Sequence, residues 1–172
     1  TRRRTAPHGG DLVSLEHTMQ ALRAQKIVCD ISDDPAHALE PYTLVHLYNL
    51  TDGAVALEYV ARARAAHKPL VVTPIYWSHA HWFETRLRAT RGERPEFFLG
   101  NLDEQDRALS RELFMQSEQF SRATHQLVCQ AAAHIFPKSR GEENLLAEEF
   151  GAAREKMRVV YNGVNPDYAR GD

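Results

Sequence analysis

The chain has 172 residues, of which 43% are hydrophobic, and a formal net charge of −2 at pH 7. These values are typical of one globular domain of moderate size. The near-neutral charge excludes a generally basic nucleic-acid-binding protein. No apolar run approaches the roughly 20 residues of a membrane-spanning helix, and no N-terminal signal peptide is evident. We therefore expect a cytoplasmic protein, with Cys29 and Cys129 as buried, reduced thiols.

The first half of the chain predicts a helix and two strands. Apolar residues at helical spacing predict a helix from Asp11 to about Arg23, whose buried face holds Leu12, Leu15, Met19 and Leu22. The β-branched run 26–31 predicts a buried strand. Residues 33–42 are polar and contain two prolines, which indicates a loop. Residues 43–50 predict a second strand.

The pattern continues with a predicted helix over 52–68, followed by a strand over 69–77 that Pro74 stops. In the predicted helix over 52–68, Arg62 and Arg64 should point outward. Val55, Tyr59 and Ala63 should point inward. Residues 103–133 predict one long helix or two, with core positions at Leu109, Leu113, Phe120, Leu127 and Ala131. A short strand over 134–137, a helix over 141–151 closed by Gly151 and a last strand within 156–166 complete the chain.

The predicted strands are unbroken apolar runs, which favours a parallel sheet covered by helices on both faces. The expected fold is therefore a doubly wound, Rossmann-like α/β domain over residues 1–172. Gly9 and Gly10 stand at the entrance to the first helix, where such a pair normally follows a strand. Only eight residues precede Gly9. We expect either that an upstream strand is absent from this chain, or that the first strand is unusually short.

Several segments, in order, carry a family resemblance: GGDLVSLEHTMQALRAQ, YTLVHLYNL, KPLVVTPIYW, HIFPKSRGEENLLAEEFG and KMRVVYNGVNP. Together they resemble the N-terminal domain of family 4 glycosyltransferases, which are retaining enzymes with two Rossmann domains (the GT-B fold). The segment VVYNGVNP is the most specific, although Asn165 stands where the family usually has Asp. The resemblance implies an acceptor-side domain. The second domain, which holds most of the nucleotide-sugar site, is absent from this chain.

The resemblance also implies substrates and roles. A nucleotide-diphosphate sugar would be the donor and a saccharide or lipid-linked hydroxyl the acceptor, with no cofactor and no metal. Gly9 and Gly10 would approach the donor diphosphate, unless they only form a tight turn. His79 is the nearest candidate for a histidine that lies close to the donor sugar. The isolated domain would be inactive.

Ligands bind beyond the carboxyl ends of the strands in open α/β sheets, so the strand ends supply further candidates. After the third strand come residues whose rings and imidazoles suit sugars, namely Tyr76, Trp77, His79, His81 and Trp82. The alternative is that the tyrosine and first tryptophan pack in the core and both histidines are solvated. Asn49 would either bond an acceptor hydroxyl or cap the next helix.

Charged residues offer three further candidates. Lys138 and Arg140 follow a strand and precede a helix, so they would meet the donor phosphates or an acidic acceptor, or else remain solvated. The run Arg2-Arg3-Arg4 would attract a lipid phosphate at a membrane surface, or form a solvated tail. The acidic residues of the helix over 141–151 should form a solvated face made of Glu142, Glu143, Glu148 and Glu149.

Two other functions compete. The first is a free-standing, flavodoxin-like module that binds a small anion at the same edge of the sheet. The second is a metal hydrolase built on His79 and His81, although no third ligand pattern accompanies that pair.

Overall fold

The computed structural model describes residues 10–34, 36–50, 53–76 and 104–163, with the backbone alone for residue 54 and most of residues 104–118. Its centre is a three-stranded parallel sheet in the order β1-β2-β3, made of Val45–Tyr48, Leu70–Thr73 and His134–Ile135. The helices are α1 (Gly10–Ala24), α2 (Gly53–Ala65), α4 (Glu104–Ala131) and α5 (Arg140–Phe150). The prediction of an α/β fold with a parallel sheet is confirmed.

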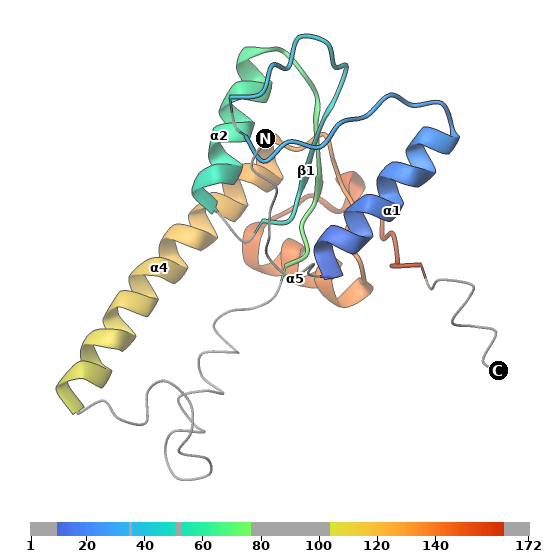
Figure 1. Cartoon of the computed structure of the whole chain (residues 1–172). Coiled ribbons are helices and arrows are strands. Elements are labelled where there is room, and N and C mark those ends of the chain that lie inside the picture. The colour runs from blue at the N-terminus through green and yellow to red at the C-terminus, as the bar shows by residue number, and fades with distance from the viewer. Residues whose placement is uncertain (1–9, 35, 51–52, 77–103, 164–172) are drawn as a thin grey trace.

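Helix α2 connects β1 to β2, and α4 connects β2 to β3. Both crossovers step across the sheet in the same direction, so the right-handed rule puts both helices on the same face. They pack directly on each other, with α1 on the other side of β1 (Figure 1). The contact is close at Gly53, where an added Cβ would lie 2.9 Å from Cγ2 of Thr124. Glycine at this position therefore allows the two helices to approach.

The two faces of the sheet differ in character because side chains alternate along a strand. On the face covered by α2, α4 and α5, Leu47 and Val72 belong to the hydrophobic core. On the opposite face, His46 bonds Thr73 through Nε2 and Oγ1 at 2.9 Å. Tyr48 lies on that polar face and contacts Ser14 of α1.

The expected last strand forms only in part. After the short 3₁₀ helix Arg154–Lys156, Met157 makes a single parallel bridge with Ile135. The N–H groups of Arg158 and Val160 then donate to the carbonyls of Ile135 and Pro137 at 2.9 and 2.8 Å. This segment therefore runs alongside β3 with strand-like spacing, but it does not build a continuous ladder.

The predicted strand over 26–31 is wrong. These residues form no strand, and Val28 is 87% exposed, while Ile27 and Ile31 are about half exposed. In the described part of the chain the outer edge of β1 has no strand beside it. β-Branched residues favour a strand only where a neighbouring strand offers hydrogen bonds and packing.

Some of the helix positions predicted to be buried are buried, and others are exposed. Ala63 and Met19 are buried as expected, and Tyr59 packs against the core, while Leu12, Leu15 and Leu22 are only half-buried. Exposure of 36% or more contradicts the inward positions predicted for Val55, Phe120 and Leu127.

The buried face of α4 is instead made of Thr124, His125, Val128 and Cys129, and Ala132, directly after the helix, is also buried. Ala131 is partly buried against the core, and the side chains of Leu109 and Leu113 lie outside the described ones. Arg64 is exposed as predicted. Arg62 is half-buried, because its Nη2 donates to the carbonyl of His37 at 2.8 Å.

Helix α5 has a clear cap at each end. Oγ of Ser139, the N-cap residue, accepts a hydrogen bond from the Glu142 N–H at 3.0 Å. Gly151 closes the helix with φ at +63°, a left-handed conformation that glycine adopts without strain. The predicted C-terminus at Gly151 is confirmed. In the described ranges, no helix combines the length and the apolar character needed to cross a bilayer.

The two cysteines should react at very different rates. Both are free, but Cys129 is buried and Cys29 only half-buried, so the expectation of two buried thiols holds for Cys129 alone. Burial raises the pKa of the Cys129 thiol to about 12. Because the thiolate is the reactive form, a thiol reagent at pH 8 should modify Cys29 rapidly and Cys129 only after unfolding. Labelling of the Cys29→Ser and Cys129→Ser proteins, with and without urea, checks this assignment. Rapid labelling of native Cys29→Ser protein would contradict it.

Candidate functional site

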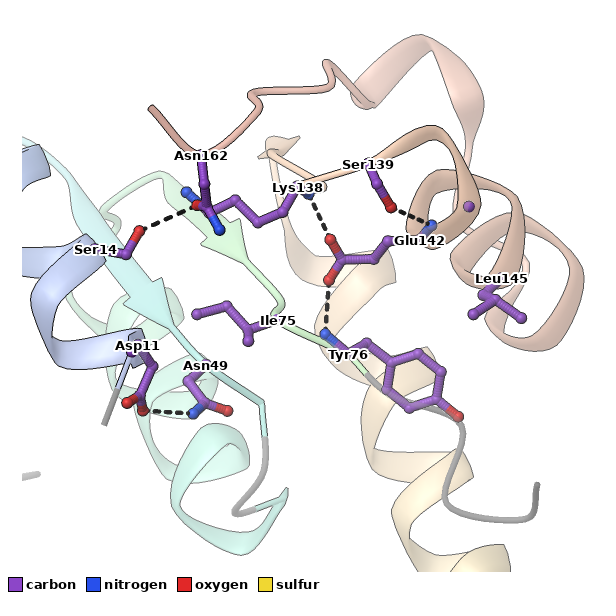
Figure 2. A pocket seen from close by; sticks show the side chains of 12 residues that line it. Asp11, Ser14, Asn49, Ile75, Tyr76, Lys138, Ser139, Glu142, Leu145 and Asn162 are labelled. Atoms are coloured by element: carbon purple, nitrogen blue, oxygen red, sulfur yellow. Dashed lines mark hydrogen bonds between the residues drawn. The ribbon is translucent and has the colours of Figure 1, made fainter. Parts of the chain in front are cut away.

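A cavity of about 730 Å³ opens at the carboxyl ends of the three strands (Figure 2). The first turns of α1 and α5 contribute to it, as do the residues that follow each strand. The lining residues are Gly10, Asp11, Ser14, Asn49, Ile75, Tyr76, Lys138, Ser139, Gly141, Glu142, Leu145 and Asn162. This is the edge of a parallel sheet at which ligands bind in open α/β proteins.

Glu142 fastens two strand ends to α5. Its Oε1 accepts a hydrogen bond from the Tyr76 N–H at 2.6 Å, and its Oε2 accepts one from the Lys138 N–H at 2.5 Å. Figure 2 shows the carboxylate between these two residues. Glu142 is buried, at 7% exposure, and both of its carboxylate oxygens accept a hydrogen bond. Each oxygen of this buried carboxylate therefore has a backbone N–H partner.

The predicted solvated acidic face is therefore wrong in part. Glu142 and Glu143 are buried, and Glu149 is half-buried and accepts a hydrogen bond from the Tyr76 hydroxyl at 2.9 Å. Only Glu148 is exposed as expected. Glu142 turns toward the cavity, whereas Glu143 does not line it and pairs with Arg140.

Asp11 and Asn49 connect α1 to the end of β1. Asp11 Oδ1 accepts a hydrogen bond from the Leu12 N–H at 2.9 Å, and Oδ2 accepts one from Asn49 Nδ2 at 3.0 Å. Asn49 has a φ of +71°. Asparagine tolerates the left-handed region better than most residues. The chain can therefore turn sharply after β1 and present an amide to the cavity.

Ile75 lies in the cavity wall with a φ of +49°. A β-branched residue in the left-handed region is strained, at a cost of about 1–3 kcal/mol. Such strain persists only where surrounding contacts impose it. The neighbouring Tyr76 is held by α5 through both its N–H and its hydroxyl.

Lys138, Ser14 and Asn162 line the side of the cavity next to α1, and Tyr48 contacts two of them. The Lys138 ammonium lies 5.4 Å from the centre of the Tyr48 ring, a cation–π contact. The Tyr48 hydroxyl bonds Ser14 Oγ at 2.5 Å. Ser14 Oγ also donates to Oδ1 of Asn162 at 3.3 Å. The last described residues of the chain are thereby joined to α1.

His46 lies behind this wall and should make stability depend on pH. Burial, and secondly the positive charge of Lys138, lower the pKa of His46 below its usual 6.5. Below pH 6.5 the unfolded chain binds a proton that the folded protein resists, so stability falls as the pH drops through 6.5. The His46→Gln protein should lose less stability than the parent between pH 7 and 5.

Urea unfolding at both pH values measures this difference, and an NMR titration of the His46 ring gives its midpoint directly. The exposed His17 provides a control, because His17→Gln makes the same substitution away from the polar face of the sheet. A His46 midpoint at or above 6.5 would contradict the prediction.

The structure brings four of the predicted site residues together: Gly10, Asn49, Tyr76 and Lys138 all line the cavity. Tyr76 also packs edge-on against Phe150, with ring centres 4.7 Å apart. Arg140 does not line the cavity; its side chain is 72% exposed and pairs with Glu143 at 2.7 Å. The remaining candidates lie outside the described residues, namely Arg2, Arg3, Arg4, Gly9, Trp77, His79, His81 and Trp82.

Glu142 is the main residue that the sequence analysis missed. The stretch Ser139-Arg140-Gly141-Glu142 has the S-x-x-E spacing of a capping box, which places Glu142 in the first turn of a helix after a strand. That signal would have put the carboxylate at the strand ends. Ser14 and Asn162 carried no such signal, since they meet only in the folded chain.

Among the residues described by the structure, no group of three or more His, Cys, Asp or Glu side chains is placed to hold a metal ion.

Comparison of the sequence with models of known protein families and with curated proteins finds no match in either set.

Proposed function

We propose that this chain is the N-terminal, acceptor-side domain of a retaining glycosyltransferase. The observation that supports this function best is the cavity at the carboxyl ends of parallel strands, bounded by the first turns of α1 and α5. Its lining is rich in hydroxyl, amide and carboxylate groups, which bond sugar hydroxyls. The sequence resemblance described above adds the reaction class.

In this proposal the complete enzyme moves a sugar from a nucleotide-diphosphate donor to an acceptor hydroxyl, with retention. Asn49 and Tyr76 bind the acceptor. Gly9 and Gly10 let the donor diphosphate approach the backbone, and Lys138 and Arg140 offset its charge. Catalysis rests on holding both substrates in line and on stabilising the leaving diphosphate.

Residues beyond the described part complete the proposed site. His79 lies near the donor sugar, and Trp77 and His81 contribute to the acceptor side. A second Rossmann domain of the same protein supplies most of the nucleotide-sugar site. Arg2, Arg3 and Arg4 would bring the domain to a membrane surface if the acceptor is lipid-linked.

The test uses the native gene product and, separately, the 172-residue chain. The native product should release nucleoside diphosphate from one member of a nucleotide-sugar panel and form a glycoside with the donor's anomeric configuration, which NMR identifies. The Asn49→Ala variant should lose most of this activity. Asn144→Ala, on the exposed side of α5, should not. The 172-residue chain should be inactive, and micromolar affinity for a nucleotide sugar in calorimetry would contradict that.

The alternative is a free-standing module that binds a small anion at the same cavity, without a donor sugar. Anions bind at helix N-termini because the first-turn N–H groups and the helix dipole attract them. Here the chain's own carboxylates, Asp11 and Glu142, lie in those first turns. Calorimetry with inorganic phosphate separates the two functions, since the alternative requires tight binding and the transferase does not.

A further inference from the structure

We infer that Tyr48 is a positioning residue, which holds the ammonium group of Lys138 at the cavity where the donor diphosphate binds. This inference rests on the proposed function, because it assumes that Lys138 offsets the charge of that diphosphate. Lys138 lines the cavity and Tyr48 does not. Tyr48 therefore acts through Lys138 rather than by touching the donor.

The Lys138 side chain reaches Tyr48 across the end of the middle strand. Tyr48 is the last residue of β1 and Lys138 follows β3, with β2 between these two strands. Nζ of Lys138 nonetheless lies 5.4 Å from the centre of the Tyr48 ring. A lysine stem is flexible and loses conformational entropy when its end is fixed. The contact with the ring is what offsets this loss.

An aromatic ring holds a cation without neutralising it. A carboxylate partner would cancel the charge of Lys138, whereas the quadrupole of a ring attracts the ammonium and leaves its net charge unchanged. An ammonium group also has three N–H donors. Lys138 can therefore contact the Tyr48 ring and a diphosphate oxygen at the same time.

A chain of hydrogen bonds fixes the Tyr48 ring. Ser14 Oγ donates its proton to Oδ1 of Asn162 at 3.3 Å (Figure 2). A serine hydroxyl has one proton, so the Tyr48 hydroxyl is the donor in its 2.5 Å bond with Ser14 Oγ. The His46 ring lies beside that of Tyr48, with ring centres 5.7 Å apart. The position of the ring, and with it that of the ammonium, is thereby set.

The first measurement is NMR of the unaltered 172-residue chain. The ε-methylene protons of Lys138 should give nuclear Overhauser contacts to the Tyr48 ring protons. Because they lie over a ring face, they should resonate upfield of those of the exposed Lys26. Inorganic pyrophosphate, the probe for the donor diphosphate, should shift the Lys138 signals in a titration. Absence of the ring contact, or of the pyrophosphate response, overturns the inference.

Substitutions measure how much the ring contributes. Tyr48→Leu should weaken pyrophosphate binding about three- to fivefold, whereas Tyr48→Phe keeps the ring and should stay within about twofold of the parent. Lys138→Met should weaken binding further than either. The matched controls Tyr42→Leu and Lys26→Met make the same changes outside the cavity lining and should leave the affinity unchanged.

A double variant separates positioning from a purely structural role. If Tyr48 acts through Lys138, Tyr48→Leu should change the pyrophosphate affinity little in the Lys138→Met background. An equal loss in both backgrounds overturns the inference, as does an unchanged affinity for Tyr48→Leu alone. If Tyr48→Leu folds poorly, the ring contact and the pyrophosphate response of the unaltered chain still decide the question.

The transfer assay distinguishes this failure from that of the proposed function. In the native gene product, Tyr48→Leu should raise KM for the donor more than it lowers kcat, and Tyr48→Phe should change neither by more than about twofold. A product that transfers sugar with an unchanged donor KM in the Tyr48→Leu variant refutes the positioning role alone. A chain that gives the expected NMR and pyrophosphate results, without transfer by the native product, refutes the proposed function alone.

Discussion

Replacement of Leu146 by alanine should lower the free energy of unfolding by about 3 kcal/mol. Leu146 is fully buried, at 0% exposure, in the core between the sheet and the helices. The truncation removes apolar contacts and leaves a cavity that a close-packed interior fills only in part. Urea unfolding followed by circular dichroism measures the loss.

Leu127→Ala is the matched control. Leu127 occupies an α4 position that hydropathy assigns to the core, but its side chain is 48% exposed. The same chemical change there should cost well under 1 kcal/mol. Equal losses for the two variants would show that the faces of α4 are assigned incorrectly.

Replacement of Glu142 by alanine should cost about 1–3 kcal/mol, because it leaves the half-buried N–H groups of Tyr76 and Lys138 without their acceptor. The two strand ends would also separate from α5. Besides a lower free energy of unfolding, we expect faster hydrogen exchange at those two amides, which NMR measures residue by residue.

The control for Glu142→Ala is Glu148→Ala, which removes an exposed carboxylate from the same helix. It should change stability by less than about 0.5 kcal/mol. If the two variants lose equal stability and the Tyr76 amide exchanges as slowly as in the parent, the role of Glu142 at the strand ends is refuted.

The strands that were predicted correctly are those whose partners lie within the described chain. The run 69–77 contains Val71 and Val72, both fully or nearly fully buried between neighbours. The run 26–31 has a similar composition but no strand beside it. The local sequence determines how strongly a segment prefers an extended backbone. Whether a neighbouring strand is present to bond it depends on the whole fold.

Helix α4 shows a different limit. Hydropathy favours Phe120 and Leu127 for the core, but the buried face carries Thr124 and His125 instead. These polar groups are buried because they are bonded: His125 Nε2 donates to the Leu50 carbonyl at 2.9 Å, and Thr124 Oγ1 donates to the Phe120 carbonyl at 2.9 Å. A hydropathy pattern contains no information about a partner as distant in sequence as Leu50.

The sequence located those residues of the candidate site that come directly after a strand. Asn49, Tyr76 and Lys138 were found by that rule, and all three line one cavity. Asp11 was expected only as the first residue of a helix, and Glu142 only on a solvated face. Their place in the cavity depends on the position of α1 and α5 relative to the sheet. Tertiary packing determines that position.

Tyr76 is attached to α5 at two points, through its N–H to Glu142 and through its hydroxyl to Glu149. The two acceptors are separated by about two helical turns, so the residue is fixed in both position and rotation. Helix α5, the end of β2 and the Tyr76 side chain therefore form one mechanical unit. Any displacement of α5 carries Tyr76 with it.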